Sequence, residues 1–263
     1  MGLGMFVVDS LVRYPDIFQK YRSEMNIKRF LKKYLSASIW NFLREFYGIY
    51  IGGYGSTSYA QEGEDVLMAR ILGGKKNGFY VDVGAHHPVR FSNTFFYYKR
   101  GWRGINVEPN PAGSRLLKRF RPRDINLELG ISDQPGQLTY WMFDEPALNT
   151  FDQALMQKRI TEAEYTLIGN KRINVVRLDS ILEKYIEPDT IIDFMSIDVE
   201  GHDLAVLKSN DWTRFRPTWI LVESLGHDSP LDKIRTDQHI FLLSKDYELY
   251  ANTVNTHIYR NLQ

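Results

Sequence analysis

The stretch GFYVDVGAHHP, from Gly78 to Pro88, decides the fold of this chain. Its apolar run ends in Asp82, and Gly84 and two adjacent histidines follow directly. A short apolar run of this kind predicts a buried strand, and Gly84 lets the backbone turn sharply and approach a ligand closely. Taken alone, the stretch is compatible with a nucleotide-binding turn, a metal site or an ordinary strand end.

Helix and strand patterns alternate along the chain from Tyr59 onward. Such alternation predicts an α/β protein with a mostly parallel, twisted sheet and helices on both faces. The predicted strands of this sheet cover residues 78–84, 103–109, 123–132, 191–201 and 217–224. Residues 136–144 predict an added antiparallel strand, and the runs 247–251 and 255–261 predict a C-terminal antiparallel hairpin.

Composition excludes several classes of protein and site. The 263 residues are 43% hydrophobic and 14% aromatic, enough to bury a large core. A formal net charge of +1 gives no drive toward nucleic acid, so no nucleic-acid partner is expected. The absence of cysteine excludes disulfides, thiolate zinc sites and a cysteine nucleophile, and it fits a reducing compartment. Because no apolar run approaches the roughly 18 residues of a spanning helix, we expect a soluble cytoplasmic protein.

Residues 1–55 differ in character from the rest and predict a helical, basic, amphipathic N-terminal extension. Within residues 27–50, lysines and arginines face away from apolar side chains at helical spacing, namely Ile27, Phe30, Leu31, Tyr34, Leu35 and Ile39. Such a helix packs on its own domain, joins two subunits of a homodimer, or makes a peripheral contact with an anionic membrane. The glycine-rich stretch 48–58 reads as the linker to a second domain, residues 56–263.

The residues that follow the first two predicted strands indicate a nucleoside. In an open α/β sheet, ligands bind beyond the carboxyl ends of the strands. Glu108 ends the second strand about two dozen residues after Gly84, the separation at which a carboxylate accepts hydrogen bonds from both ribose hydroxyls. His86 and Pro88 stand where further glycines would cradle a pyrophosphate. The pattern therefore favours S-adenosylmethionine, and a nicotinamide-dependent oxidoreductase and a non-catalytic Rossmann-like membrane or assembly module stay as alternatives.

A series of longer motifs resembles one family. SYAQEGEDVLMARIL, GFYVDVGAHHPVRFSNTFFYYKRGWRGINVEPNP, NLELGISDQPGQLTYW, VVRLDSIL and MSIDVEGHDLAVLKSNDW are similar, in this order, to the motifs of FkbM-type S-adenosylmethionine-dependent methyltransferases. The similarity runs from Tyr59 to Glu223. It implies a Rossmann-like class I methyltransferase fold for residues 56–263 and O-methylation of a hydroxyl on a sugar-containing acceptor, such as a glycan, a nucleotide sugar or a glycosylated natural product.

The resemblance also implies roles around the methionine end of the cofactor. Asp82 and Gly84 are expected to shape this end of the site, and His86 to contact the cofactor or pack beside it. Asn93 and Thr94 open the next predicted helix, whose N-terminus is expected to hold the cofactor's carboxylate.

The other cofactor contacts implied by the resemblance concern the nucleoside. Glu108 is expected to bind the ribose. Ser132 and Asp133 are expected at the adenine edge, and Gln61 is expected to close the pocket.

A second group of polar residues follows the fourth and fifth predicted strands. Asp198 and Glu223 are hard oxygen ligands that converge on one cation if these strands are neighbours, and Mg²⁺ is the first choice. The arrangement resembles metal-dependent O-methyltransferases, in which the cation lowers the pKa of the attacking hydroxyl. His202 is the expected general base because its ordinary pKa is near neutral, and Asp198 is the second choice.

Overall fold

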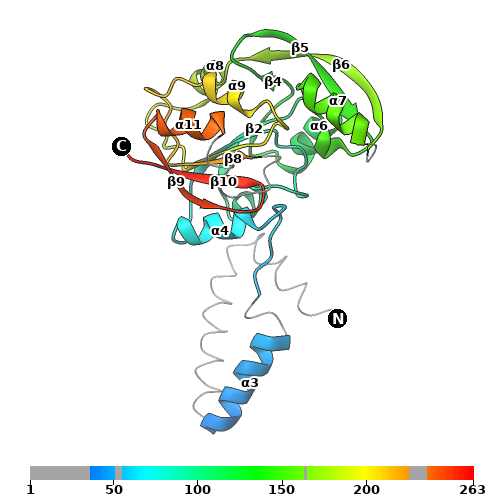
Figure 1. Cartoon of the computed structure of the whole chain (residues 1–263). Helices are drawn as coiled ribbons and strands as arrows, with labels where there is room; N and C mark the ends of the chain where they lie inside the picture. Colours follow the sequence, from blue (N-terminus) through cyan, green and yellow to red (C-terminus); the bar gives the residue numbers. More distant parts are fainter. Residues whose placement is uncertain (1–35, 51–54, 163–164, 225–235) are drawn as a thin grey trace. The chain divides into compact units, whose positions relative to one another are not determined.

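The computed structural model describes residues 36–50, 55–162, 165–224 and 236–263 (Figure 1). The chain divides into two units, Met1–Ser56 and Thr57–Gln263. The first contains helix α3 (Ala37–Tyr50). The helices of the second unit are α4 (Glu64–Ile71), α5 (Phe95–Tyr98), α6 (Pro111–Phe120), η1 (Pro146–Leu148), α7 (Gln153–Glu162), α8 (Leu178–Tyr185), α9 (Asp203–Lys208) and α11 (Asp237–Leu243). Its strands are β1 (Phe79–Val83), β2 (Arg103–Val107), β3 (Ile125–Leu127), β4 (Gly130–Ile131), β5 (Gly136–Phe143), β6 (Leu167–Val176), β7 (Phe194–Ile197), β8 (Trp219–Glu223), β9 (Tyr247–Asn252) and β10 (Thr256–Asn261).

Seven strands form the central sheet in the order β3-β2-β1-β7-β8-β10-β9. β1 pairs in parallel with both β2 and β7, and β7 pairs in parallel with β8. β10 is antiparallel to β8 and β9. The predicted parallel sheet and C-terminal hairpin are therefore confirmed. Because the chain leaves β1 toward β2 on one side and returns as β7 on the other, the strand order reverses at β1, where open sheets bind ligands.

Both faces of the sheet are covered, as predicted. Alternate residues of a strand point to opposite faces, and in β1 Val81 and Tyr80 belong to different hydrophobic clusters. The Val81 cluster also contains buried residues of α8, α9 and α11. The Tyr80 cluster contains Met68 of α4 and Tyr97 of α5, with Trp102 beside them. The sheet is thus the middle layer of three, and it holds the ends of β1, β2, β7 and β8 in fixed register.

Two predicted strands differ from the observed ones. Residues 123–132 were expected to form one strand, yet they form β3 in the central sheet and β4 in a second sheet. Gly130 lets β6 approach closely, because a Cβ atom there would lie 2.7 Å from the ring of Phe151 and 2.9 Å from Val175 of β6. Residues 136–144 do form an antiparallel strand, β5, but it pairs with β6 in the sheet β4-β6-β5.

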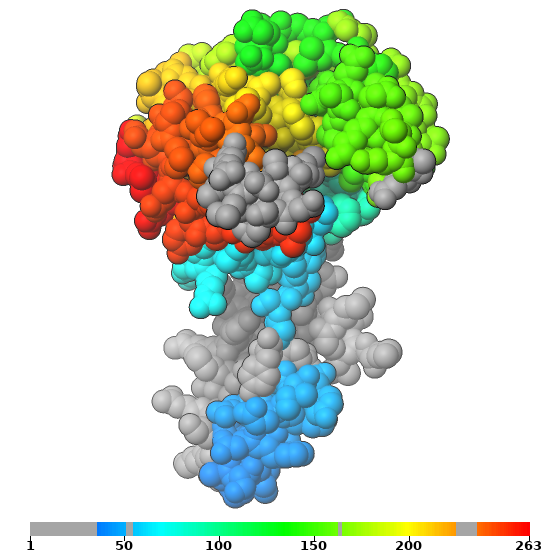
Figure 2. All heavy atoms as spheres, in the orientation of Figure 1, coloured from blue at the N-terminus to red at the C-terminus, as the bar shows by residue number. Residues whose placement is uncertain are grey.

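This second sheet and α7 form an insertion between β3 and α8. Figure 1 shows β5, β6 and α7 grouped at the end of the domain opposite α4 in that view. In Figure 2 the green residues of the insertion form one side of the visible face, and the orange and red C-terminal residues form the other. The insertion therefore covers part of the surface of the domain, and the strand pattern of the central sheet does not predict it.

Helix α3 is the described part of the predicted N-terminal extension. Much of its apolar surface is exposed, including Phe42 at 68% and Tyr50 at 73%. The predicted basic residues 27–35 lie outside the described residues. Helix packing, a homodimer and a membrane contact therefore remain predictions for this segment. Among the described residues, no helix is long and apolar enough to cross a bilayer.

Candidate functional site

The turn after β1 packs directly on the end of β7. Gly84 has a left-handed backbone with φ of 86°. Its N–H donates to the carbonyl of Val107 at 2.9 Å, and the N–H of Asp198 donates to the carbonyl of Val83 at 3.0 Å. A Cβ atom on Gly84 would lie 1.8 Å from the carbonyl oxygen of Asp198. Only glycine fits a left-handed turn at so close an approach.

Gly84→Ala is therefore expected to destabilise the domain by about 3 kcal/mol, because the new methyl group must push the end of β7 away. Urea unfolding followed by circular dichroism would measure this loss. Gly101→Ala is a matched control, because Gly101 has a similar φ of 97° but open space around its missing Cβ. Equal losses in the two variants would show that backbone strain alone matters and that the close approach of Gly84 to the Asp198 carbonyl adds nothing.

Glu108 is held at the end of β2 by the backbone. Its carboxylate accepts hydrogen bonds from the N–H groups of His86 and Asn110, each at 2.7 Å. Its side chain is nearly buried, and burial raises its pKa to about 7. A Cβ atom on Gly113 would lie 3.0 Å from Cγ of Glu108 and 2.4 Å from the carbonyl of His86, so α6 also needs a glycine to approach. The carboxylate is thus fixed in position before any ligand binds.

Two pockets meet at this edge of the sheet. The first, here called the Glu108 pocket, is lined by Gly84, His86, Glu108, Pro109, Tyr140, Pro146, Ala147, Asn149, Phe151, Asp198, Val199 and Glu200. The second, the Glu223 pocket, is lined by Gln61, Glu62, Glu64, Phe91, Asn93, Asp198, Glu223, Asn255 and Thr256. Asp198 lines both, so this residue stands at the boundary between them.

The Glu223 pocket is closed by contacts between the two ends of the domain. Glu62 accepts hydrogen bonds from the N–H of Asn255 at 2.8 Å and from its side-chain amide at 2.6 Å. Glu64 accepts from the hydroxyls of Thr256 at 3.0 Å and Thr253 at 3.2 Å. The segment before α4 is thereby tied to the turn between β9 and β10.

Three carboxylates gather where the pockets meet. Asp198, Glu200 and Glu223 each place one oxygen within 4.8 Å of the others. Burial and the neighbouring carboxylates raise the pKa of Asp198 and of Glu223 well above its ordinary value. Arg159 of α7 donates to Glu200, but no described donor reaches the buried Oε2 of Glu223. The raised pKa of both groups favours a proton shared between Asp198 and Glu223.

Asp82 and Thr94 belong to a buried polar network. The Thr94 hydroxyl donates to Asp82 at 2.5 Å and accepts from Arg121 at 2.9 Å. Arg121 in turn pairs with Asp124 and donates to the hydroxyl of Tyr80. Neither Asp82 nor Thr94 is among the described residues that line the two pockets. Their contacts favour a role in holding β1, β2 and the start of α5 together.

Asn93 and Gln61 both line the Glu223 pocket rather than the Glu108 pocket. The side-chain amide of Asn93 donates to the hydroxyl of Ser196 on β7 at 3.0 Å. Gln61 is exposed at the mouth of this pocket. The structure thus places these two residues with Asp198 in the Glu223 pocket, and not with Glu108.

His202 lies beside the predicted adenine-edge residues. Its Nε2 is 3.2 Å from the hydroxyl of Ser132, and its ring centroid is 5.8 Å from that of Phe151. Burial lowers its pKa, against the opposing charges of Asp133 and Asp152. Within the described residues, no contact joins the His202 ring to the three carboxylates. His202 therefore lies beside Ser132, whereas we expected it next to Asp198 and Glu223.

The two histidines after β1 have different environments. His86 lines the Glu108 pocket, and its buried Nε2 has no hydrogen-bond partner among the described residues. Burial lowers the pKa of His86 to about 4, so its imidazole is neutral. Nδ1 of His87 accepts from the N–H groups of Val89 at 3.0 Å and Arg90 at 2.9 Å, which closes a local turn. His86 is thus the histidine with a free polar atom for a ligand.

A model of the methyltransferase FkbM domain matches residues 82–249, which is more than half of the chain. The chain belongs to the FkbM methyltransferase family. The match covers the described parts of the strands β2 to β8 and the whole wall of the Glu108 pocket. None of the curated proteins matches the sequence.

Solved structures with a related fold include other methyltransferases. The methyltransferase FkbM from Methylobacillus flagellatus aligns over 70% of this chain at 16% identity, with a TM-score of 0.43. This FkbM-family chain spans 44% of the length of that protein. An O-methyltransferase from Bacillus cereus, solved in complex with SAH, aligns over 89% of this chain and 96% of its own at 12% identity, with a TM-score of 0.34. A putative RNA methyltransferase from Pyrococcus horikoshii aligns over 76% of this chain and 84% of its own at 9% identity, with a TM-score of 0.37.

Sequence reasoning missed Glu200, Arg159 and the aromatic residues of the insertion. Glu200 stands two residues after Asp198, and its backbone takes a positive φ of 54°, which turns it back toward the strand end. Tyr140 and Phe151 line the Glu108 pocket from β5 and the segment before α7. The sequence offers one signal for Glu200: it is an acidic residue directly before Gly201, in the turn that follows a predicted strand. No pattern within residues 136–162 indicates which side chains face the site.

Proposed function

We propose that this FkbM-family protein is an S-adenosylmethionine-dependent O-methyltransferase that acts on a hydroxyl of a sugar-containing acceptor. The observation that carries the proposal is the position of Asp198 between two pockets. One pocket has the features of a nucleoside site, and the other is lined by polar and acidic side chains. A group at their boundary is where a proton must be removed during methyl transfer from one bound molecule to another.

The residues of the Glu108 pocket fit the cofactor. Glu108 is prepared to accept hydrogen bonds from the two ribose hydroxyls, and the buried Nε2 of His86 lacks a partner that a ligand can supply. Tyr140 and Phe151 offer aromatic surface for a purine ring. His202, bonded to Ser132, would then border the adenine. When bound, the cofactor supplies a methyl group on a positively charged sulfur.

The Asp198–Glu223 pair is the proposed general base. The acceptor oxygen forms a bond to the methyl carbon as the carbon–sulfur bond breaks, and the electron pair of that bond stays on sulfur. The acceptor's proton passes to the carboxylate of Asp198. A raised pKa makes this carboxylate a stronger base than an ordinary aspartate, which suits removal of a hydroxyl proton near neutral pH. The other residues of the Glu223 pocket would hold the acceptor's hydroxyls by hydrogen bonds.

The donor set also fits a divalent cation. Three carboxylates converge, one buried oxygen among them lacks a described donor, and hard oxygen ligands of this kind suit Mg²⁺. Bound there, Mg²⁺ would hold acceptor oxygens and lower the pKa of the reacting hydroxyl. Activity measured in excess chelator, with and without added Mg²⁺, separates this arrangement from a metal-free Asp198–Glu223 base.

The function is tested with a labelled methyl donor and a panel of acceptors. The full chain is incubated with S-adenosylmethionine and with oligosaccharides, nucleotide sugars, glycosylated natural products and their sugar-free counterparts. We expect label on a sugar-containing acceptor, attached to oxygen, together with S-adenosylhomocysteine. Mass spectrometry locates the methyl group. Label on nitrogen, or equal labelling of the sugar-free counterparts, would overturn the proposed acceptor class.

The raised pKa of Glu108 predicts a pH dependence of cofactor binding. The ionised carboxylate is the form that accepts from two hydroxyls, and in the free protein burial holds its pKa at about 7. Below about pH 7 the carboxyl must lose a proton before it binds, so affinity for S-adenosylhomocysteine falls as pH falls, by up to about tenfold per pH unit. Above about pH 8 the affinity is level. Calorimetry across this range measures the change.

Glu108→Gln provides the control for this pH dependence, because an amide does not titrate. Its affinity should be weaker and nearly constant across the same range. Calorimetry in buffers of different ionisation enthalpy should also show proton release on binding to the native protein near neutral pH, and none with the variant. A flat profile for the native protein would mean that Glu108 does not contact the ribose.

A further inference from the structure

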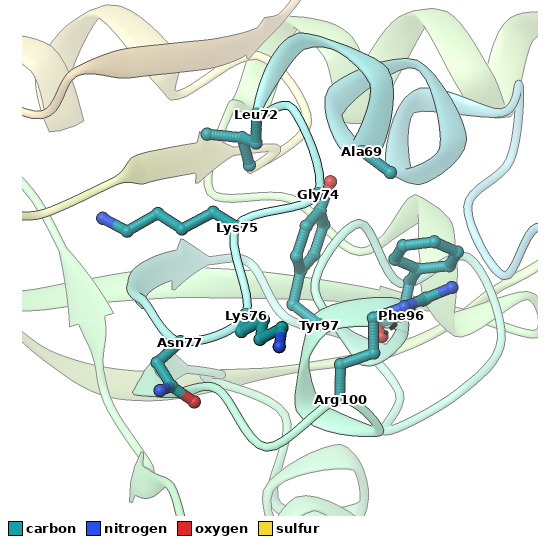
Figure 3. Close-up of a pocket in the computed structure, with 9 residues that line it drawn as sticks. All are labelled: Ala69, Leu72, Gly74, Lys75, Lys76, Asn77, Phe96, Tyr97 and Arg100. Carbon is teal, nitrogen blue, oxygen red and sulfur yellow. Dashed lines mark hydrogen bonds between the residues drawn. The ribbon is translucent and has the colours of Figure 1, made fainter. Parts of the chain in front are cut away.

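A third pocket lies at the opposite edge of the sheet. This pocket, here called the Lys76 pocket, has a volume of about 610 Å³. Its walls are Ala69, Leu72, Gly74, Lys75, Lys76, Asn77, Phe96, Tyr97 and Arg100 (Figure 3). They come from the end of α4, the loop before β1, and the segment from α5 toward β2. Since β1 begins just after this loop and spans about 17 Å before the Glu108 pocket begins, the Lys76 pocket is separate from the proposed active site.

The Lys76 pocket is positively charged. Lys75, Lys76 and Arg100 line it, and no acidic residue is among its described walls. Lys75 is engaged, because its ammonium pairs with Asp193 at 2.5 Å. Figure 3 shows the Lys75 side chain directed away from Phe96 and Arg100. Within the described part of the chain, no carboxylate forms an ion pair with Lys76 or Arg100, so two positive charges that are not in ion pairs line the pocket.

Arg100 is held in place without being neutralised. Its guanidinium donates to the carbonyl of Phe96 at 3.0 Å and lies 3.2 Å from the centre of the Phe96 ring. Burial lowers the pKa of Arg100, whereas hydrogen bonds to carboxylates raise the pKa of Arg90 and Arg177. The charge of Asp65 raises the pKa of Arg100, but no ion pair joins the two side chains in the described part of the chain. The remaining N–H groups of a fixed guanidinium are well suited to a phosphate.

The rest of the Lys76 pocket is largely apolar. Ala69, Leu72 and the ring of Phe96 contribute hydrocarbon surface next to the two cations. A ligand that satisfies both parts carries an anionic group and an apolar group close together. The chain's own N-terminal extension is basic, so charge disfavours it as the occupant.

We propose that the Lys76 pocket binds a phosphate monoester attached to an apolar chain, with the phosphate between Lys76 and Arg100 and the apolar part against Leu72 and Phe96. The phosphate accepts hydrogen bonds from the ammonium and the guanidinium, and burial of the apolar part adds affinity that inorganic phosphate lacks. A soluble phosphorylated metabolite and a membrane lipid both offer this chemistry. The inference does not depend on the reaction proposed at the other edge of the sheet.

Binding is tested on the full chain with short-chain dioctanoyl phosphatidic acid, kept below the concentration at which it forms micelles. Calorimetry should show binding at least about tenfold tighter than that of inorganic phosphate, and also tighter than that of dioctanoylglycerol, which lacks the phosphate. The double variant Lys76→Gln/Arg100→Gln should weaken it by about tenfold or more. The control Lys171→Gln/Lys208→Gln removes the same charge from exposed positions outside the pocket and should bind normally.

Each outcome of this experiment decides the proposal. Unchanged binding in the Lys76→Gln/Arg100→Gln protein overturns it. Weakened binding together with native affinity for S-adenosylhomocysteine, which shows an intact domain, supports it. If inorganic phosphate binds as tightly as dioctanoyl phosphatidic acid, the apolar part of the proposed ligand is wrong. If dioctanoylglycerol binds as tightly, the phosphate part is wrong. Sedimentation with phosphatidic acid vesicles identifies the source. If the Lys76→Gln/Arg100→Gln protein sediments less with the vesicles, the ligand is a membrane lipid. If sedimentation is unchanged while the variant binds the monomeric lipid more weakly, the ligand is a soluble molecule.

Discussion

Asp198→Asn is expected to reduce turnover by roughly a thousandfold, because the amide keeps the shape of the side chain but cannot take the acceptor's proton. The affinity for S-adenosylhomocysteine should change by less than about threefold, since Glu108 and the backbone around it stay in place. Turnover is measured with saturating cofactor, and affinity by calorimetry. Glu187→Gln removes an exposed acid that lines neither pocket, and this control should leave both quantities unchanged.

Two further measurements make the Asp198→Asn result specific. If Mg²⁺ is bound by this cluster, the native enzyme loses activity in excess chelator and the variant responds less to added Mg²⁺. If the native enzyme keeps full activity in chelator, the Asp198–Glu223 pair removes the acceptor's proton without a metal ion. A larger loss of turnover in His202→Ala than in Asp198→Asn would return the role of base to His202, despite its position beside Ser132.

Glu108→Ala is expected to weaken S-adenosylhomocysteine binding by about 2–4 kcal/mol, because two charge-assisted hydrogen bonds to the ribose are lost. Removing the carboxylate also frees the N–H groups of His86 and Asn110, so thermal unfolding is measured alongside calorimetry. Glu128→Gln is a matched control, because Glu128 follows the neighbouring strand β3 but is exposed. An unchanged dissociation constant in Glu108→Ala would place the cofactor elsewhere.

The middle of the central sheet could be predicted from sequence because β1, β7 and β8 are compact, mostly apolar runs. Asp82, Glu108, Asp198 and Glu223 stand at strand ends, and parallel strands bring their carboxyl ends to one edge of a sheet. The insertion could not be predicted in the same way. Its strand β5 is only partly buried and pairs with β6, from which it is separated by η1 and α7.

The positions of single side chains were the less predictable part of the site. Asn93 and Thr94 are adjacent in sequence, yet Asn93 lines the Glu223 pocket and Thr94 is fully buried against Arg121. The orientation of His202 depends on a partner, Ser132, that lies 70 positions away. Such contacts between distant segments are set by packing, and local sequence patterns do not carry them.

The two pockets draw on different stretches of the chain, and this bears on how the family could diversify. Every wall of the Glu108 pocket lies between residues 84 and 200, within the family match of 82–249. The Glu223 pocket also takes residues 61–64, before that match, and Asn255 and Thr256, after it. If the proposed function is right, the methyl donor is bound by residues inside the family match, and the choice of acceptor depends partly on the segments before and after it. Grafting both flanks together from another member would therefore transfer acceptor preference while cofactor affinity stays the same, and a protein trimmed to residues 82–249 would lack half of its acceptor wall.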